Sequence, residues 1–212
     1  MYEMQLDEIV LGSRAILSRL NLSLCEGEVL CILGPSGCGK TTILNELAGL
    51  GVTAPWQNNQ PEVGYLFQEP RLLPWRTLKQ NLMIVHPDGE RVMSILKSVK
   101  LERYADYYPS QISLGMARRA ALARCLLCEP DIVLMDEPLA SLDMQTAHEM
   151  LVLISDLVGK DPRRSMIYVT HDPDEALAIG DQIAVLKGSP ASLFFYGEAK
   201  ELDLAMLESM LR

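Results

Sequence analysis

The sequence VLCILGPSGCGKT, residues 29–41, decides the fold, because it joins a short apolar run to a glycine-rich segment. Residues 34–41 fit the pattern G-x-x-x-x-G-K-[ST], in which glycines let the backbone turn tightly so that successive N–H groups face one concavity. A helix that follows such a turn adds partial positive charge at its N-terminus. The stretch therefore predicts a phosphate-binding loop between a strand and a helix, with a nucleoside triphosphate as its ligand.

Each polar group of this loop has an expected task. Lys40 is expected to reach the β- and γ-phosphates, and the Thr41 hydroxyl to ligate Mg²⁺, a hard cation that prefers oxygen. The alternative is a glycine-rich turn without a ligand, which the strand before it and the helix after it disfavour. The predicted nucleotide-binding residues are Gly34, Pro35, Ser36, Gly37, Cys38, Gly39, Lys40, Thr41 and Thr42.

Length and composition limit the possible functions. The 212 residues, 49% of them hydrophobic, are enough for one domain with its own core. A net charge of -9 argues against nucleic acid as a partner, because nucleic-acid affinity depends largely on basic side chains. No apolar run reaches the roughly 18 residues of a membrane span, and the N-terminus carries acids where a signal peptide has bases. We therefore expect a cytoplasmic protein.

Strand-like runs alternate with helical segments along the chain, which predicts an α/β fold with a mostly parallel sheet. The segment 69–130 has helical periodicity and no convincing strand, so we expect a helical insertion there. Residues 51–61 are rich in turn formers and are expected to form a loop. Strands are predicted at 29–33, 63–67, 132–135, 166–169 and 183–186, and helices at 91–99 and 114–127 and from Thr41, Thr146 and Asp174.

Two carboxylates follow the apolar run at residues 132–135, at the end of a strand where parallel sheets place their ligands. Asp136 is suited to hold Mg²⁺, and Glu137 to polarise an attacking water as general base. The alternative is that both acids cap a turn before Pro138. Beside a phosphate-binding loop, we favour the catalytic interpretation.

Cysteines and the C-terminal segment have simpler explanations. We expect reduced thiols, and we interpret Cys125 and Cys128 as core residues at helical spacing rather than as metal ligands. Residues 199–212 have an apolar stripe at Leu202, Met206, Leu207 and Met210, which predicts a helix packed on the core.

The order of these motifs resembles the ATP-binding subunit of ABC transporters over nearly the whole chain. The resemblance implies a P-loop NTPase (RecA-like) fold in one domain, 1–212, with a core at 1–68 and 131–212, a helical subdomain at 69–130 and a reduced antiparallel β-subdomain. It also implies that Gln68 contacts Mg²⁺ and the attacking water, and that His171 contacts the γ-phosphate. It further implies a dimer in which Ser113, Gly115 and Asp143 act on the nucleotide of the opposite subunit.

The chain departs from the family pattern in two places. The family signature Leu-Ser-Gly-Gly-Gln corresponds here to residues 112–116, ISLGM. Leu114 stands where the signature has a glycine, which costs about 1–2 kcal/mol of stability if the backbone there is left-handed and little if it is helical. The stretch 9–12 lacks the aromatic residue that stacks on adenine in the family. We expect a weakened but working site. The alternatives are a nucleotide-binding regulatory module with little turnover and a soluble ABC ATPase of repair or translation.

Residues 69–82 resemble the importers of nitrate, sulfonates, taurine and related molecules, including thiamine precursors. This resemblance implies an ATP-hydrolysing importer subunit, peripheral at the cytoplasmic membrane face, that acts with permease subunits and a second ATPase chain, which we expect to be identical. We predict that Leu72, Leu73 and Trp75 are exposed and dock the permease. Packing of Trp75 within the subdomain is the alternative.

Overall fold

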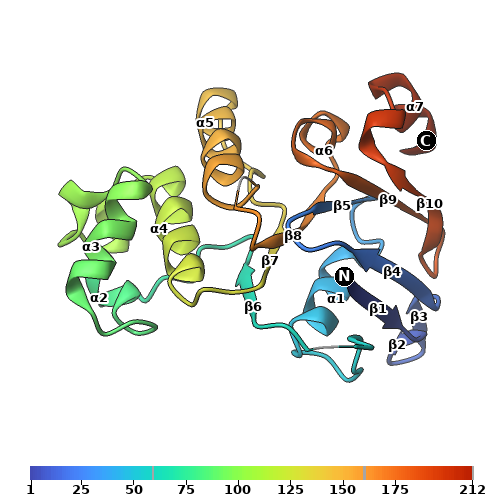
Figure 1. The fold of residues 1–212 in the computed structure, drawn as a ribbon, viewed down its shortest axis with the longest axis horizontal. Coiled ribbons are helices and arrows are strands. Elements are labelled where there is room, and N and C mark those ends of the chain that lie inside the picture. Colours follow the sequence, from blue (N-terminus) through green and yellow to red (C-terminus); the bar gives the residue numbers. More distant parts are fainter. Residues whose placement is uncertain (59, 160, 212) are drawn as a thin grey trace.

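A central sheet of six strands organises the computed structural model, which describes residues 1–58, 60–159 and 161–211 (Figure 1). Its order is β10-β9-β5-β8-β7-β6, and its neighbours are parallel except for β10, which is antiparallel to β9. The predicted mostly parallel α/β fold is therefore confirmed. The strands are β5 (Val29–Leu33), β6 (Val63–Leu66), β7 (Ile132–Asp136), β8 (Ser165–Thr170), β9 (Gln182–Lys187) and β10 (Ser192–Glu198).

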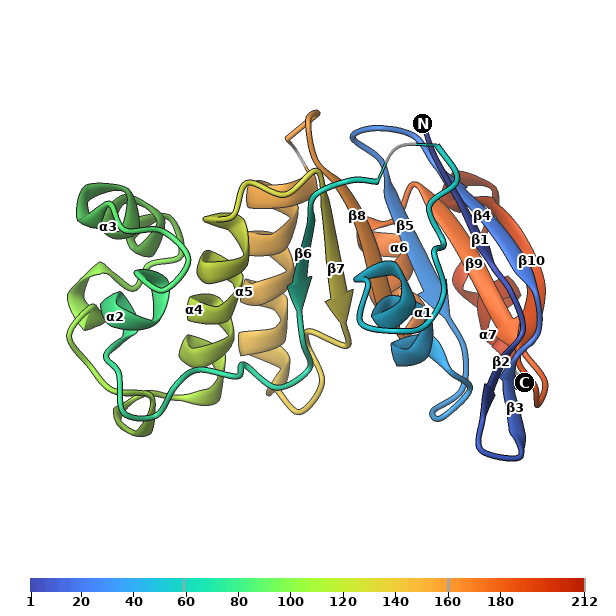
Figure 2. The ribbon, with the colours of Figure 1, turned by 90° about the horizontal axis from the view of Figure 1, so that it is seen from below.

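Helices cover both faces of this sheet, which explains why every residue of β5, β7 and β8 is buried (Figure 2). On one face, α1 (Lys40–Leu47) packs against Leu30 and Ile32 of β5. The residues between them, such as Cys31, point to the opposite face and join the second apolar cluster. That face is covered by α5 (Met144–Ile154), α6 (Pro173–Ile179) and α7 (Leu204–Leu211).

The N-terminal residues form two small antiparallel pairs that sequence analysis did not locate. β1 (Tyr2–Leu6) pairs with β4 (Leu20–Leu24), and β2 (Ile9–Leu11) pairs with β3 (Arg14–Leu17). Alternate residues of β4 are buried, as expected for a strand with one face on the core. These pairs form the reduced antiparallel part of the fold, at the opposite end of the molecule from α2–α4 (Figure 1).

Between β6 and β7 the chain is helical, as predicted. α2 (Leu78–Leu82), α3 (Gly89–Ser98) and α4 (Leu114–Leu126) lie together at one end of the molecule (Figure 1). Their apolar residues continue the cluster on the α5 face of the sheet. No helix among the described residues has the length and apolar character needed to cross a membrane.

Two predictions outside the site were partly wrong. The predicted helix 199–212 is interrupted: a short 3-10 helix, Ala199–Glu201, precedes α7, and Arg212 lies outside the described residues. Leu207 is buried as expected, but Met206 is 50% exposed, because adjacent residues of α7 point about 100° apart around the helix. Cys125 is a core residue, whereas Cys128 is exposed because α4 ends before it; the cysteines are free thiols.

Candidate nucleotide-binding site

The loop between β5 and α1 has the backbone that its glycines allow. Gly37 (φ 76°) and Gly39 (φ 106°) are left-handed, a conformation that other residues rarely adopt. Gly39 also caps α1, so the free N–H groups of the first turn begin directly after the loop. The local geometry therefore suits an anion such as a phosphate group.

Lys40 is buried at the first position of α1. Its ammonium group donates to the carbonyls of Gly34 (2.8 Å) and Pro35 (3.2 Å) and lies 3.6 Å from a carboxylate oxygen of Glu137. A buried cation needs such partners. These contacts hold the ammonium group of Lys40 between the loop and the end of β7.

Thr41 and Asp136 meet across the junction of α1 and β7. The Thr41 hydroxyl donates to an Asp136 carboxylate oxygen at 2.8 Å. Burial raises the pKa of Asp136, while the bond from Thr41 lowers it. A hydroxyl and a carboxylate are the oxygen ligands that Mg²⁺ prefers, so this pair fits the predicted metal site.

Glu137 follows in a strained backbone conformation. Its φ of 43° is left-handed, which costs a residue with a side chain about 1–2 kcal/mol. Its N–H donates to the carbonyl of Val169 at 2.9 Å, and Nδ1 of His171 lies 3.5 Å from its carboxylate. The carboxylate thus lies between Lys40 and His171, where it can accept a proton.

Gln68 follows the end of β6 and lines the same cavity as Glu137. The segment after it is held by Arg124 of α4, which donates to the carbonyls of Arg71 (2.9 Å) and Pro70 (3.1 Å). Arg71 in turn lies over the ring of Phe67, 3.7 Å from its centroid. The two Arg124 bonds could not be predicted from the sequence, because they join residues more than 50 positions apart.

A cavity of about 420 Å³ is lined by eight of the sixteen predicted site residues. Ser36, Gly37 and Gly39 of the loop line it, together with Lys40–Thr42, Gln68 and Glu137. Pro35 and Cys38 line a separate cavity on the other side of the loop, and Asp136 is buried beside Thr41. His171 lines an adjoining cavity that shares Gln68 and Glu137. Two aliphatic residues, Leu11 and Ile16, close the side toward β2 and β3, where the family has its aromatic residue. Ile16 had no signal in the sequence beyond strand alternation.

The residues predicted to act across a dimer form a separate group at the N-termini of α4 and α5. Ser113 caps α4 by accepting from the N–H of Met116 at 3.2 Å, and Asp143 caps α5 by accepting from the N–H of Thr146 at 3.0 Å. Hydrogen bonds from Thr146 hold the pKa of Asp143 below its ordinary value. Leu114 is the first helical residue of α4 and has no left-handed backbone, so its substitution for glycine costs little.

Gly115 is buried where α4 meets α5. A Cβ atom on Gly115 would lie 2.6 Å from Cγ2 of Thr146, closer than side chains tolerate. This packing gives Gly115 a structural role in the single chain, independent of any phosphate contact.

Substitution of Gly115 tests this packing role. Gly115→Ala is expected to lower the free energy of unfolding by about 1–3 kcal/mol, because α4 must move away from Thr146. Adding Thr146→Ser removes the clashing methyl but keeps the hydroxyl. Denaturant titrations of this double variant should show that most of the lost free energy of unfolding is regained. A double variant as unstable as Gly115→Ala alone would show that another contact is responsible.

The predicted docking residues are only partly exposed. Leu72 and Leu73 are half-buried, contrary to prediction, because Leu72 packs on the core and the backbone of Leu73 is bonded to the side chain of Asn81. Trp75 is 69% exposed, so the alternative that it packs within the helical segment is wrong. The amide of the fully buried Asn81 also donates to the carbonyls of Arg76 and Thr77, which fixes the loop that carries Trp75.

Comparison with known proteins agrees with this geometry. A family model described as ABC transporter matches residues 17–140. The chain is 40% identical over 195 residues to an aliphatic sulfonates import ATP-binding protein of Burkholderia lata, covering 86% of this chain and 71% of the relative. It is 37% identical over 196 residues to the corresponding protein of Bacillus subtilis, covering 84% and 75%.

Solved structures show the same architecture. A dimeric ATP-binding cassette in a post-hydrolysis state, bound to ADP and Pi, superposes with a TM-score of 0.78 at 27% identity, covering 94% of this chain and 99% of that chain. CbiO1 from Clostridium perfringens superposes with a TM-score of 0.80 at 24% identity, covering 94% and 89%. The second likeness concerns the fold alone.

Proposed function

The chain belongs to the ABC transporter family, and from this premise we propose that it hydrolyses ATP to drive the import of a small molecule. One observation carries the proposal: Lys40, Thr41 and Glu137, from α1 and the end of β7, line one cavity behind a phosphate-binding loop. A cation, a metal-ligating hydroxyl and a carboxylate that can accept a proton are the groups that phosphoryl transfer to water needs.

We assign the roles as follows. Residues 34–42 bind the phosphates, and Thr41, Asp136 and Gln68 would hold Mg²⁺, which neutralises phosphate charge when bound. Glu137 accepts the proton of the attacking water, while Gln68 and His171 orient the water and the γ-phosphate. Gln68 and Glu137 line both of the adjoining cavities, which supports this assignment.

The working unit we propose is a dimer of two identical chains. Ser113, Gly115 and Asp143 would contact the nucleotide of the opposite subunit, since they lie at two neighbouring helix N-termini outside the chain's own cavity. We retain residues 1–68 and 131–212 as the core and 69–130 as the helical subdomain. The helical backbone of Leu114 removes the main argument for an inactive regulatory module.

The names of the relatives indicate the cargo to test first. Proteins 37–40% identical to this chain are named for the import of aliphatic sulfonates, so we propose a small molecule of that class. The chain would lie at the cytoplasmic face of the membrane, bound to permease subunits through the loop that carries Trp75.

Two measurements test this function. The purified chain should release phosphate from ATP in the presence of Mg²⁺, and cells without the chain should lose uptake of a labelled alkanesulfonate. Hydrolysis with unchanged uptake would contradict the cargo, and no hydrolysis by an ATP-bound dimer would contradict the enzymatic role.

Trp75 is expected to matter for docking and not for folding. Trp75→Ala should reduce the fraction of the chain that sediments with cell membranes, while the free energy of unfolding changes by no more than about 0.5 kcal/mol because the side chain is exposed. Trp56→Ala is the contrasting control, which should lower the free energy of unfolding. Trp56 is half-buried, and its indole N–H donates to the carbonyl of Leu47 at 3.0 Å. Unchanged sedimentation of Trp75→Ala would place the docking surface elsewhere.

A further inference from the structure

Arg118 is a buried cation that the proposed function does not use. It lies on α4, 5% exposed, and its Nη1 donates to the carbonyl of Pro138 at 2.8 Å. Its Nε is buried without a hydrogen-bond partner in the described part of the chain. A buried guanidinium with so few partners is costly, so its place in the core needs an explanation.

The partner of Arg118 directly follows the proposed general base. Pro138 comes after Glu137, whose left-handed backbone is held by bonds from its own N–H to Val169 and from the N–H of Ala140 to its carbonyl. The bond from Arg118 adds a contact from α4 to this backbone turn. The helix that precedes β7 therefore also contacts the turn that follows β7, next to Glu137.

The same helix begins at the proposed dimer contact. Ser113 caps α4, and Arg118 follows on that one continuous helix. Because a helix moves largely as a rigid body, a displacement of its N-terminus also displaces Arg118 and the turn that it holds. The side chain thus connects the surface that would face a second subunit with the residue that would activate water in its own subunit.

We propose that Arg118 is a positioning residue for ATP hydrolysis, which holds the Glu137–Pro138 turn and links it to the N-terminus of α4. The inference rests on the proposed function, since it assumes that Glu137 activates water. It concerns the rate of the chemical step and not nucleotide affinity, because Arg118 does not line the nucleotide cavity.

Steady-state ATP hydrolysis by purified variants tests the inference. Arg118→Met keeps the length and burial of the side chain but removes its donors, and we expect kcat to fall about 10- to 100-fold with KM within about twofold of wild type. Arg118→Lys can still donate to Pro138 and should recover part of kcat. ATP-driven dimerisation should persist in both variants, because the binding residues are unchanged.

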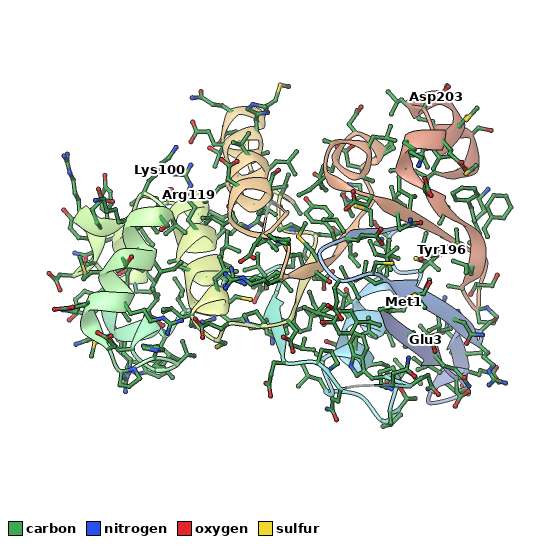
Figure 3. The ribbon with its side chains drawn as sticks, viewed as in Figure 1. Met1, Glu3, Lys100, Arg119, Tyr196 and Asp203 are labelled. Carbon is green, nitrogen blue, oxygen red and sulfur yellow. The ribbon has the colours of Figure 1, made fainter. Side chains whose placement is uncertain are left out.

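Arg119 provides the matched control on the same helix. It pairs with Glu149 of α5 at 2.6 Å. Figure 3 labels Arg119 on α4, on the side that faces α5. Arg119→Met also removes a contact between α4 and a neighbouring element, yet it should leave kcat within about twofold of wild type.

The outcomes separate this inference from the function on which it rests. A folded Arg118→Met variant with the kcat of an active wild type would overturn the inference alone. Equal losses in Arg118→Met and Arg118→Lys, or a proportional rise in KM, would indicate packing and also overturn it. An inactive wild-type chain would overturn the proposed function together with the inference. If Arg118→Met does not fold, Arg118→Gln replaces it, because its shorter side chain should not reach Pro138.

Discussion

Glu137→Gln is expected to reduce ATP turnover by about 10²- to 10⁴-fold, the usual contribution of a general base, while ATP binding is retained. Glutamine keeps the size of the side chain and its hydrogen-bonding capacity but cannot take the proton of an attacking water. The position of the carboxylate supports this role, since it lies 3.6 Å from Lys40 and 3.5 Å from His171 at the edge of the cavity.

Light scattering makes the same variant a test of the dimer. With ATP and Mg²⁺, Glu137→Gln should accumulate as a dimer, because the bound nucleotide is not consumed, whereas ADP should leave it monomeric. Glu149→Gln is the control, since Glu149 is exposed on α5 and pairs with Arg119. Unaffected turnover in Glu137→Gln would remove this residue from the role of base.

Lys40→Met is expected to weaken ATP binding by about 10- to 100-fold. A hydrogen bond to a charged group contributes about 1.5–3 kcal/mol, and each 1.4 kcal/mol is about tenfold in affinity. Methionine has a similar length and no charge, so it can occupy the buried position, 4% exposed, without leaving a large void.

Titration calorimetry with ATP and Mg²⁺ measures this effect, with the exposed Lys97→Met as control. Denaturant titration of the same samples should show a smaller change in the free energy of unfolding, since Lys40 donates to two loop carbonyls and approaches Glu137. An affinity equal to that of the control would mean that the phosphates do not bind next to Lys40.

Local signals in the sequence were sufficient to predict the strands and the helix at the centre of the molecule. The apolar runs before Gly34 and Asp136 are continuous, and the residue types after them fit one chemistry, so β5, β7 and the start of α1 were predicted nearly to the residue. β2 and β3 are only three and four residues long, and β10 is half-exposed along its length, so the alternation of these strands was too weak to recognise.

Other features depend on contacts that no local pattern contains. Leu72 and Leu73 read as an exposed apolar pair, but Asn81 turns the loop so that both become half-buried. The bonds from Arg118 to Pro138 and from Arg124 to Arg71 join residues 20 and 53 positions apart. Such pairs become visible only when the folded chain brings them together.

The close packing of Gly115 on Thr146 also bears on how this protein can evolve. A methyl group at position 115 has no room while position 146 carries one of its own. Of the two orders of change, the one that first removes the methyl at 146 avoids this clash and its cost in stability. Lineages that keep threonine at 146 should retain glycine at 115, whether or not natural selection acts on their transport activity.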